Sequence, residues 1–556
     1  MHKRLWLSIA ALAIGAGLLV AAGFASPASS NTAKAGSKAA KGGTLRVDQT
    51  SDFDFIDPAL AYFSHSWQVE LATQCKLLGF PDKEAKAGGS RIVPDAAKSL
   101  PAISKDGKTY SFTVRSGIKF ADGTNVTAAN FAYAINRDLQ PKMSSPATTF
   151  LEDVAGAKAV LDGKAQTASG VKASGNKLTI KLSKVAPDFL ARMTMPFFGA
   201  IKTDTPVNPD GIGAPAKGAS CGPYFVSDWT QKRQLVMSRN TFYKGSRPAN
   251  PDQIVENIGI APDAQRLRVE SGETDVGGFP PAAAAELRDK YGVNKMHTGS
   301  SPSFIVRPQA VFWYLNLNHD QPLFKNNDAL ARAVNYAIDR PQMVRQHGAL
   351  AGTRTDQILP IGFPGFKDAN IYPLKGSNYA KANALAKGKT RGGKCEFWTF
   401  NRTFGPTVAQ VVQFNLAKIG LNCNITPLDR VVETTKGGTR GAQFDILLNG
   451  WGQDYPDPYD FINILLSGTS IQPENNVNLS YFNSPKWNAR MAAASRLSPP
   501  ARYTAYAKLD KDLMAQAAPV APYVNTNARV LVSKRVGCYV YSPAYNVSIL
   551  NALCVS

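Results

Sequence analysis

The sequence predicts a mixed α/β protein with more than one compact domain. The clearest indication is a strand–helix–strand run, with apolar strands at 395–400 and 421–426 on either side of a helix at 406–419. A unit of this kind pairs its two strands in parallel. Alternating apolar and polar residues at 109–114 and 177–182 predict further, half-buried strands. The length of 556 residues exceeds that of a typical single domain.

Short strands and helices are expected to alternate through the first half of the chain. A strand opens at 43–47, a helix follows at 66–78, and the first alternating strand turns into a partner strand that begins at 118–120. Thr127 fits the N-cap of a helix through Arg137, because its side chain can satisfy free amide groups of the first turn. Further elements are expected as strands at 222–226 and 234–239, a helix at 262–271 ending at Gly272, strands from 274 and at 312–317, and helices at 327–338 and 379–387.

The N-terminus has the pattern of an export signal. Two basic residues precede an apolar run at 5–25, and small residues follow it. We expect a signal peptide at 1–28, with an uncleaved anchor as the alternative because the run is about as long as a bilayer is thick. Residues 29–41 are expected to form a flexible tether. No cysteine precedes Cys75, so the exported protein is not expected to be a lipoprotein.

Six cysteines form an even set, which in an exported chain indicates disulfides. One favoured pair joins the starts of two strands that flank one helix, another closes a loop near the C-terminus, and the third is left by elimination. In that order, the three pairs are Cys395–Cys423, Cys538–Cys554 and Cys75–Cys221. Free buried thiols are the alternative.

The formal net charge is +22, of which two positive charges belong to the leader. A basic surface can attract nucleic acid or anionic lipid. The lysines and arginines are nevertheless scattered, with no dense run and no interleaved aromatic residues. We therefore expect a basic but nonspecific surface and no nucleic-acid partner.

Two enzyme-like motifs occur in the wrong context. GKTRGGK (388–394) has the spacing of a phosphate-binding loop, but Cys395 and a strand follow it instead of a helix. GASCG (218–222) resembles a nucleophile motif, but Pro223 and a strand follow it. Histidine is scarce, and no zinc-binding spacing occurs. We expect neither catalysis nor a cofactor or metal.

GWGQDYPDP (450–458) follows a short apolar strand at 444–448. Glycine and proline are expected to end that strand, and ligands of open α/β sheets bind at strand ends. The segment places two aromatic residues beside two carboxylates. Such a combination suits a small cationic or amino-bearing ligand.

A series of segments resembles one family in order and spacing. They are KGGTLRV (41–47), DPALAY (57–62), KDGKTYSFTVRSGIKFADGTNVTAANFAYAINR (105–137), CGPYFV (221–226), SRNTFY (238–243), ESGETDV (270–276), YLNLN (314–318), ALARAVNYAIDR (329–340), LAKIGLNCNI (416–425) and GWGQDYPDP (450–458). Over about residues 42–545 the chain is similar to the extracytoplasmic solute-binding proteins of family 5, the dipeptide, oligopeptide and nickel binders of ABC importers. The chain differs from the family at Cys221, where family members usually have Thr, and at Asn130, where they usually have Asp.

The resemblance implies a two-lobed periplasmic-binding-protein-like fold of type II, which closes on its ligand about a hinge. Lobe I would take residues 42–305 and 521–556, with a subdomain inserted at about 91–199, and lobe II would take 306–520. Two crossovers near 305 and 520 would form the hinge. The implied protein is an extracytoplasmic monomer that captures peptides for a membrane permease and performs no reaction.

The resemblance also implies binding residues. The aspartate that holds a peptide's α-amino group falls on Asp454, with Trp451 and Tyr455 as its aromatic surroundings. A buried ammonium needs such a paired carboxylate. Asp457, between two prolines, is expected to cap backbone amides instead. A capping role is the alternative for Asp454, and a place in the core is the alternative for Trp451.

Arg402 is the candidate for the ligand's carboxylate. It follows the strand at 395–400, and its separation from Asp454 resembles that in dipeptide binders. Its planar guanidinium suits a carboxylate, and a solvated loop arginine is the alternative. Tyr62 and Phe63 are candidates for the lobe I wall. The competing functions are capture of a nickel chelate or oligosaccharide, and a secreted hydrolase.

Overall fold

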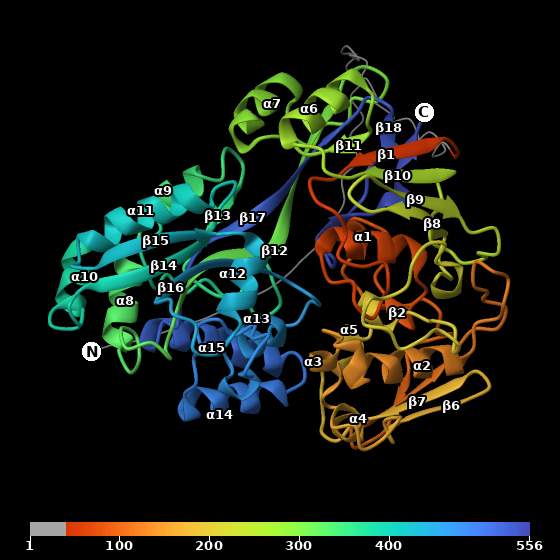
Figure 1. Cartoon of the computed structure of the whole chain (residues 1–556), viewed down its shortest axis with the longest axis horizontal. Helices are drawn as coiled ribbons and strands as arrows, with labels where there is room; N and C mark the ends of the chain where they lie inside the picture. Colours follow the sequence, from red (N-terminus) through yellow and green to blue (C-terminus); the bar gives the residue numbers. More distant parts are fainter. Residues whose placement is uncertain (1–40) are drawn as a thin grey trace, which may run out of the picture. The chain divides into compact units, whose positions relative to one another are not determined.

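A large mixed sheet organises residues 41–556, which are the residues that the computed structural model describes (Figure 1). The predicted leader, and the predicted tether up to residue 40, lie outside these residues. The strands follow the order β15 (Asn422–Leu428), β14 (Lys394–Phe400), β16 (Ile446–Gly452), β12 (Ser303–Leu317), β17 (Val520–Val532), β11 (Val276–Gly277), β1 (Thr44–Asp48), β10 (Gln253–Asn257), β9 (Gln234–Arg239) and β8 (Tyr224–Thr230), with β13 (Gly352–Arg354) added beside β17.

The two long strands β12 and β17 belong to both halves of this sheet. Ser303–Pro308 of β12 pairs with one end of β17, and Phe312–Asn316 pairs with the other. Between these stretches the register shifts, opposite Thr526, and such an irregularity bends a strand. This bend lies a few residues from the crossovers expected near 305 and 520. We keep the names lobe I and lobe II for the predicted residue ranges, whose boundaries remain a prediction.

Lobe II contains the strand–helix–strand unit read from the sequence. β14 and β15 pair in parallel, and α11 (Gly405–Ala417) connects them. The predicted helix at 327–338 is α8 (Asp328–Ala337), whose Leu330 and Val334 are buried. The other helices are α9 (Arg340–Arg345), α10 (Tyr379–Ala386), α12 (Arg430–Gly437), α13 (Tyr459–Leu466), α14 (Pro485–Ser495) and α15 (Ala501–Gln516).

Lobe I carries the other half of the large sheet and a separate four-stranded sheet. The latter has the order β4 (Ala102–Ile103), β5 (Thr109–Thr113), β7 (Lys177–Lys181) and β6 (Val171–Ser174). The helices are α1 (Ser64–Thr73), α2 (Ala128–Asp138), α3 (Thr148–Leu151), α4 (Ala157–Leu161), α5 (Phe189–Arg192), α6 (Pro262–Ser271) and α7 (Ala284–Tyr291). Short strands are β2 (Leu78–Gly79), β3 (Val93–Pro94), β18 (Val536–Cys538), β19 (Tyr541–Ser542), β20 (Val547–Ser548) and β21 (Cys554–Val555).

Helix α2 shows why its N-terminus was readable in the sequence. Thr127 is the N-cap, and its backbone N–H donates to Asn130 Oδ1 at 2.8 Å in a capping box. The amide nitrogen of Asn130 also donates to the carbonyl of Ile201 at 3.0 Å. An aspartate carboxylate could accept the first bond but could not donate the second. Asn130 therefore joins the cap to the neighbouring loop.

All three predicted disulfides are present. Cys395 and Cys423 lie directly opposite each other in the parallel register of β14 and β15. The other two bridges are Cys538–Cys554, between β18 and β21, and Cys75–Cys221. The last one closes the longest loop, with a sequence separation of 146, and cross-links of this kind constrain the unfolded chain.

Several element predictions were wrong in extent or kind, among them the strand expected at 312–317, which is β12 and already starts at Ser303. Residues 118–120 form no strand with β5, and only Lys119 makes an isolated bridge, to Asn125. Helix α1 ends at Thr73 because the chain turns there toward the bridge at Cys75. The apolar strand expected at 444–448 is β16, which starts later and continues through Gly452, because β12 pairs with it up to that residue.

Candidate functional site

The first glycine of GWGQDYPDP, Gly450, lies inside strand β16 where a tryptophan packs across the strand. Gly450 pairs with Trp313 of β12. A Cβ atom on Gly450 would lie 2.7 Å from the indole ring of Trp313, well inside van der Waals contact. Glycine at this position therefore lets the indole lie flat against β16, and the chain leaves the sheet two residues later, at Gly452.

Asp454 lies just beyond the end of β16 and is held from two sides. Its backbone N–H donates to Asp460 Oδ2 at 2.9 Å. Its own Oδ2 accepts a hydrogen bond of 2.7 Å from the hydroxyl of Tyr62, which belongs to lobe I. The Asp454 side chain is thus a direct link between the two lobes.

Burial controls the protonation of this group. Asp454 is only 8% exposed, and loss of solvent raises the pKa of its carboxyl to about 7. Burial, together with the neighbouring Asp454, raises the pKa of Asp460 well above its usual value. Burial and Asp454 likewise raise the pKa of Tyr62. Near neutral pH the Asp454 carboxyl is therefore close to its pKa, and a cation bound beside it would favour the ionised form.

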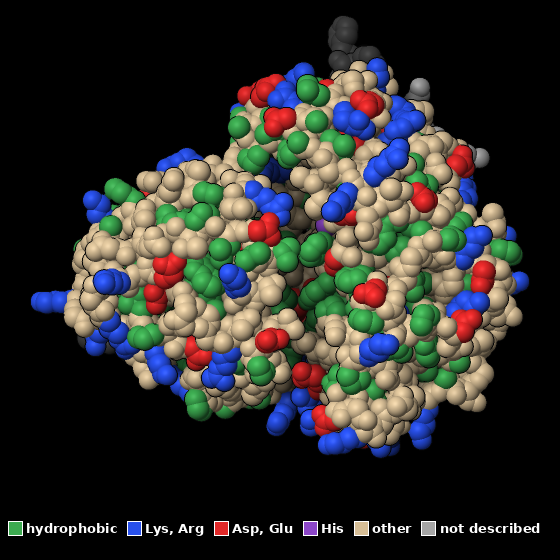
Figure 2. Space-filling view, viewed as in Figure 1, with side chains coloured by type: hydrophobic (Ala, Val, Ile, Leu, Met, Phe, Trp, Pro, Cys, Tyr) green, Lys and Arg blue, Asp and Glu red, His purple; other side chains and the backbone are tan. Residues whose placement is uncertain are grey.

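The candidate residues around Asp454 differ in exposure. A groove runs between the two lobes, and hydrophobic side chains gather on both of its walls (Figure 2). Tyr62 is half-buried and Phe63 is 48% exposed, so both retain surface that a ligand can contact. Trp451 is half-buried against the lobe II core, and its Nε1 has no hydrogen-bond partner among the described residues.

Tyr455 points into the other lobe. It is fully buried among residues of the lobe I subdomain, with its ring edge-on to Phe150 at 6.1 Å between centroids. Its hydroxyl donates to Asp188 Oδ2 at 2.9 Å. The side chain has no free face for a ligand, so Tyr455 is not among the binding residues proposed below.

A buried ion network surrounds this contact. Asp188 also receives Arg192 Nε at 2.9 Å and lies 3.8 Å from Arg502 of lobe II. Arg502 in turn pairs with Asp457 at 2.6 Å. Asp457 accepts the backbone N–H of Tyr459 at 2.9 Å, which confirms its predicted capping role. The arginine pairing was not predicted, because Arg502 lies far away in sequence.

No side chain among residues 41–556 pairs with Arg402 to hold it in a site. It is exposed, and it makes no ion pair with the residues that the structure describes. Arg430, the first residue of α12, lies beside Phe400 at the end of β14 and donates to Glu433 Oε2 at 2.7 Å and to Asn449 Oδ1 at 2.6 Å. The sequence offered no signal for Arg430, because its aromatic neighbours Phe400 and Trp313 come from strands β14 and β12, which are distant in sequence.

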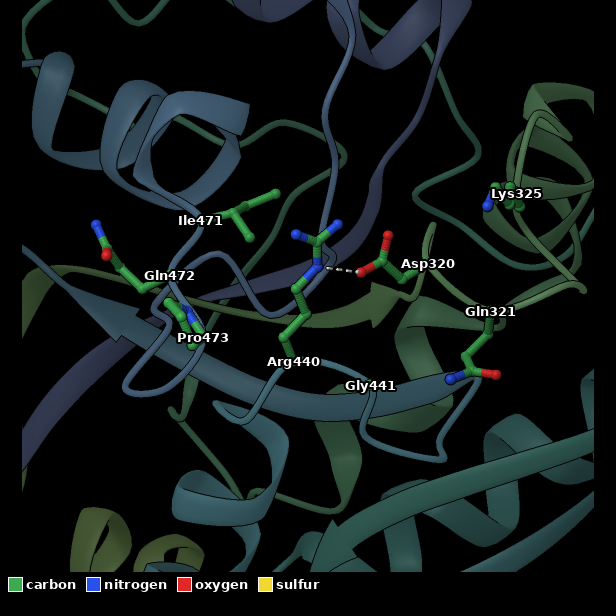
Figure 3. Close-up of a pocket in the computed structure, with 8 residues that line it drawn as sticks. All are labelled: Asp320, Gln321, Lys325, Arg440, Gly441, Ile471, Gln472 and Pro473. Carbon is green, nitrogen blue, oxygen red and sulfur yellow. Dashed lines mark hydrogen bonds and ion pairs between the residues drawn. The ribbon is translucent and has the colours of Figure 1, made fainter.

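A second hollow lies at the opposite end of β16 (Figure 3). It has a volume of about 530 Å³. Arg440 crosses it and pairs with Asp320 at 3.1 Å between Nε and Oδ2. The other lining residues are Gln321, Lys325, Gly441, Ile471, Gln472 and Pro473. Its charged groups are largely solvent-exposed, and it has no buried carboxylate comparable to Asp454.

Comparison with known proteins identifies the family. The family model described as bacterial extracellular solute-binding proteins, family 5, middle region, matches residues 91–473, which is more than half of the chain. The chain belongs to this family. The match confirms the predicted resemblance, and the family is made of extracellular binding proteins. Within residues 41–556, no helix combines the length and the apolar character needed to cross a membrane.

Relatives cover most of the chain. The periplasmic oligopeptide-binding protein OppA of Escherichia coli is 26% identical over 455 residues, which are 78% of this chain and 80% of OppA. The glutathione-binding protein GsiB of Shigella dysenteriae is 24% identical over 483 residues, 85% of this chain and 87% of GsiB.

Solved structures agree on the fold. Clavulanic acid biosynthesis oligopeptide binding protein 2 superposes with a TM-score of 0.84 at 22% identity, covering 93% of this chain and 96% of the other. The murein tripeptide binding protein MppA of Escherichia coli has a TM-score of 0.77 at 23% identity, covering 93% and 99%. These neighbours confirm the predicted two-lobed α/β fold class.

Proposed function

We propose that this family 5 protein captures peptides with a free amino terminus between its lobes and delivers them to the permease of an ABC importer. The observation that carries the proposal is Asp454, a buried carboxylate at the end of a sheet strand, facing a tyrosine of the other lobe. A ligand ammonium at this place would replace the neutral Tyr62 donor with a charged one. Charge-assisted hydrogen bonds of this kind are about twice as strong as neutral ones.

The surroundings of Asp454 favour a peptide over a simple amine. Trp451, three residues before Asp454, is half-buried and keeps part of its aromatic surface for a ligand. Phe63, half-exposed on lobe I, adds an apolar surface. An apolar wall with a few converging polar groups is the usual make-up of a ligand site.

The names of the relatives support the same substrate class. OppA is an oligopeptide-binding protein, and MppA binds a murein tripeptide. GsiB binds glutathione, which also carries an amino group and carboxylates. We further propose that the protein acts outside the cytoplasm, as a monomer, and catalyses no reaction on its ligand.

The test replaces Asp454 by Asn and measures binding of a pool of tri- to hexapeptides by native mass spectrometry, followed by calorimetry on the best-bound member at pH 8. Breaking a buried charge pair costs about 3 kcal/mol or more, so we expect the affinity to fall at least about 100-fold. Asp320→Asn, in the hollow at the other end of β16, is the matched control and should leave affinity unchanged. Equal affinities of Asp454→Asn and wild type would disprove the assignment, and failure of the wild type to capture any peptide would disprove the function.

A further inference from the structure

A separate cavity, with a volume of about 430 Å³, lies in lobe I beside the strand pair β2–β3. Lys76, Phe80, Arg247 and Tyr545 line it, and none of them belongs to the site around Asp454. They come from three segments that are distant in sequence. The volume falls within the range of small-molecule sites, about 300–1,000 Å³, so the cavity is large enough for a ligand of its own.

Lys76 enters this lining without a counter-charge. The residue is only 2% exposed, yet its ammonium makes no hydrogen bond and no ion pair with any residue of 41–556. Its Nζ lies 5.1 Å from the ring centroid of Tyr545. Burial, together with the nearby Arg247, lowers the pKa of Lys76 to about 8. An ammonium has three donors, and here all three are available to an acceptor that enters the cavity.

The two carboxylates of the lining are already engaged elsewhere. Asp95 Oδ2 accepts the backbone N–H of Lys76 at 2.9 Å, and its Oδ1 lies 3.8 Å from Arg247 Nε. Asp82 Oδ2 accepts the side-chain amide of Asn551 at 2.8 Å, and burial raises the pKa of Asp82. Neither carboxylate lies within ion-pair distance of the Lys76 ammonium. A buried cation in this state gains from an added anion.

Arg247 adds a second cation that is held mainly by neutral groups. Its Nη1 donates to the carbonyl of Leu71 at 2.6 Å, and its Nη2 donates to the carbonyl of Gln74. Burial raises the pKa of the neighbouring Glu70 well above its usual value, which favours the uncharged form of that carboxyl. The lining has three basic residues against two acidic ones, namely Lys76, Lys83 and Arg247 against Asp82 and Asp95. The cavity therefore favours an anionic group.

The rest of the lining is largely apolar. Phe80 and Tyr545 pack edge to face, with 5.3 Å between their ring centroids. Further apolar side chains come from Leu71, Val93, Pro94 and Pro248. A ligand that fits both parts of the lining has an anionic group at one end and an apolar body at the other. Inorganic phosphate would satisfy only the charge.

We propose that this cavity binds a small organic carboxylate, with the carboxylate on Lys76 and the apolar body against Phe80 and Tyr545. The site is distinct from the groove that holds Asp454, and it goes beyond peptide capture. It does not depend on the proposed function, because it uses neither Asp454 nor any other residue of that groove.

The test measures binding of benzoate by ligand-observed NMR, with benzamide as its uncharged counterpart. Loss of a hydrogen bond between charged groups weakens binding about tenfold or more, so we expect benzamide to bind wild type at least about tenfold more weakly. Lys76→Gln should weaken benzoate binding by a similar factor. Lys217→Gln is the matched control and should leave it unchanged, since Lys217 also lies beside an aromatic ring, 5.4 Å from the centroid of Phe225, but is exposed.

Three outcomes would overturn the proposal. They are equal benzoate affinities of wild type and Lys76→Gln, absence of benzoate binding to wild type, and inorganic phosphate binding as tightly as benzoate. Benzoate should also remain bound when the peptide that wild type captures best is added in excess. Displacement by that peptide would place benzoate in the groove between the lobes and would equally refute the site. If no peptide is captured, the proposed function fails while the benzoate result stands.

A measurement on wild type covers the case in which Lys76→Gln fails to fold. Dilute acetic anhydride at pH 8 modifies uncharged amines, and peptide mapping by mass spectrometry reports each lysine separately. Benzoate should slow acetylation of Lys76 and leave that of Lys217 unchanged. Equal acetylation of Lys76 with and without benzoate would contradict the proposal.

Discussion

Tyr455 of lobe II donates a hydrogen bond to Asp188 of lobe I, 2.9 Å away, and both side chains are buried. The residue immediately before it, Asp454, accepts a hydrogen bond from Tyr62 of lobe I. Two adjacent residues thus bind the opposite lobe at two separate places. The end of β16 is both the candidate binding site and a contact that holds the lobes together.

Tyr455→Phe should destabilise the protein and loosen the closed arrangement. Removing one hydrogen bond to a charged partner costs about 1.5–3 kcal/mol, because Asp188 stays buried without that donor. The measurement is urea unfolding, with small-angle scattering to follow the radius of gyration without ligand. Tyr503→Phe is the control, since the Tyr503 hydroxyl makes no hydrogen bond with a described residue, and it should change stability by less than about 0.5 kcal/mol. Equal stabilities of the two variants would contradict the prediction.

Arg502→Met should be more damaging. It leaves Asp457 and Asp188 buried with one cation fewer, and breaking a buried ion pair from one side costs about 3–5 kcal/mol. Adding Asp457→Asn to the same chain should recover part of the loss, because it removes the uncompensated charge. Thermal unfolding of the single and double variants tests this order, and a double variant less stable than Arg502→Met would refute it.

Peptide affinity should fall as the pH decreases below about 7. Burial raises the pKa of Asp454 to about 7 in the ligand-free protein, and a ligand ammonium binds the ionised carboxyl. Below that pH, binding must first remove a proton, so affinity should drop about tenfold per pH unit. Calorimetry between pH 5.5 and 8.5, in buffers of different ionisation enthalpy, should detect proton release at the acid end. Asp454→Asn should show no such dependence above the titration range of the remaining groups.

Gly450→Ala should disturb the site through Trp313. The added Cβ would overlap the indole ring, and accommodating such overpacking costs about 1–3 kcal/mol. Because Gly450 lies only four residues before Asp454 on the same segment, peptide affinity should fall together with stability. Gly452→Ala is the matched control on the same strand, where the added Cβ would meet only a methyl group of Val311, at 3.3 Å. Similar losses in both variants would show that the effect belongs to the strand and not to Trp313.

Local signals explain why much of the fold was predictable. The N-cap at Thr127, the helix end at Gly272 in a left-handed conformation, and the alternation in β5 and β7 each depend on a few neighbouring residues. The disulfide Cys395–Cys423 followed from the strand–helix–strand pattern, because parallel strands bring their starting residues side by side.

The structure around Asp454 could be predicted from the sequence only in part. Its composition indicated an acidic, aromatic strand end, and the family order singled out Asp454 from Asp457. The sequence did not indicate the position of Tyr455 in the other lobe, the packing of Trp313 over Gly450, or the contacts of Arg430 with Glu433 and Asn449. Each of these depends on side chains from strands or lobes that are distant in sequence.

The sequence by itself determined the local elements, the disulfide pairs and the family, because short-range hydrogen bonding, periodicity and motif order encode them. Only the tertiary structure decided which polar groups lose their water and which partners they then receive. Asp454 and Glu433 owe their raised pKa values to burial by several distant segments, and no window of neighbouring residues contains that information.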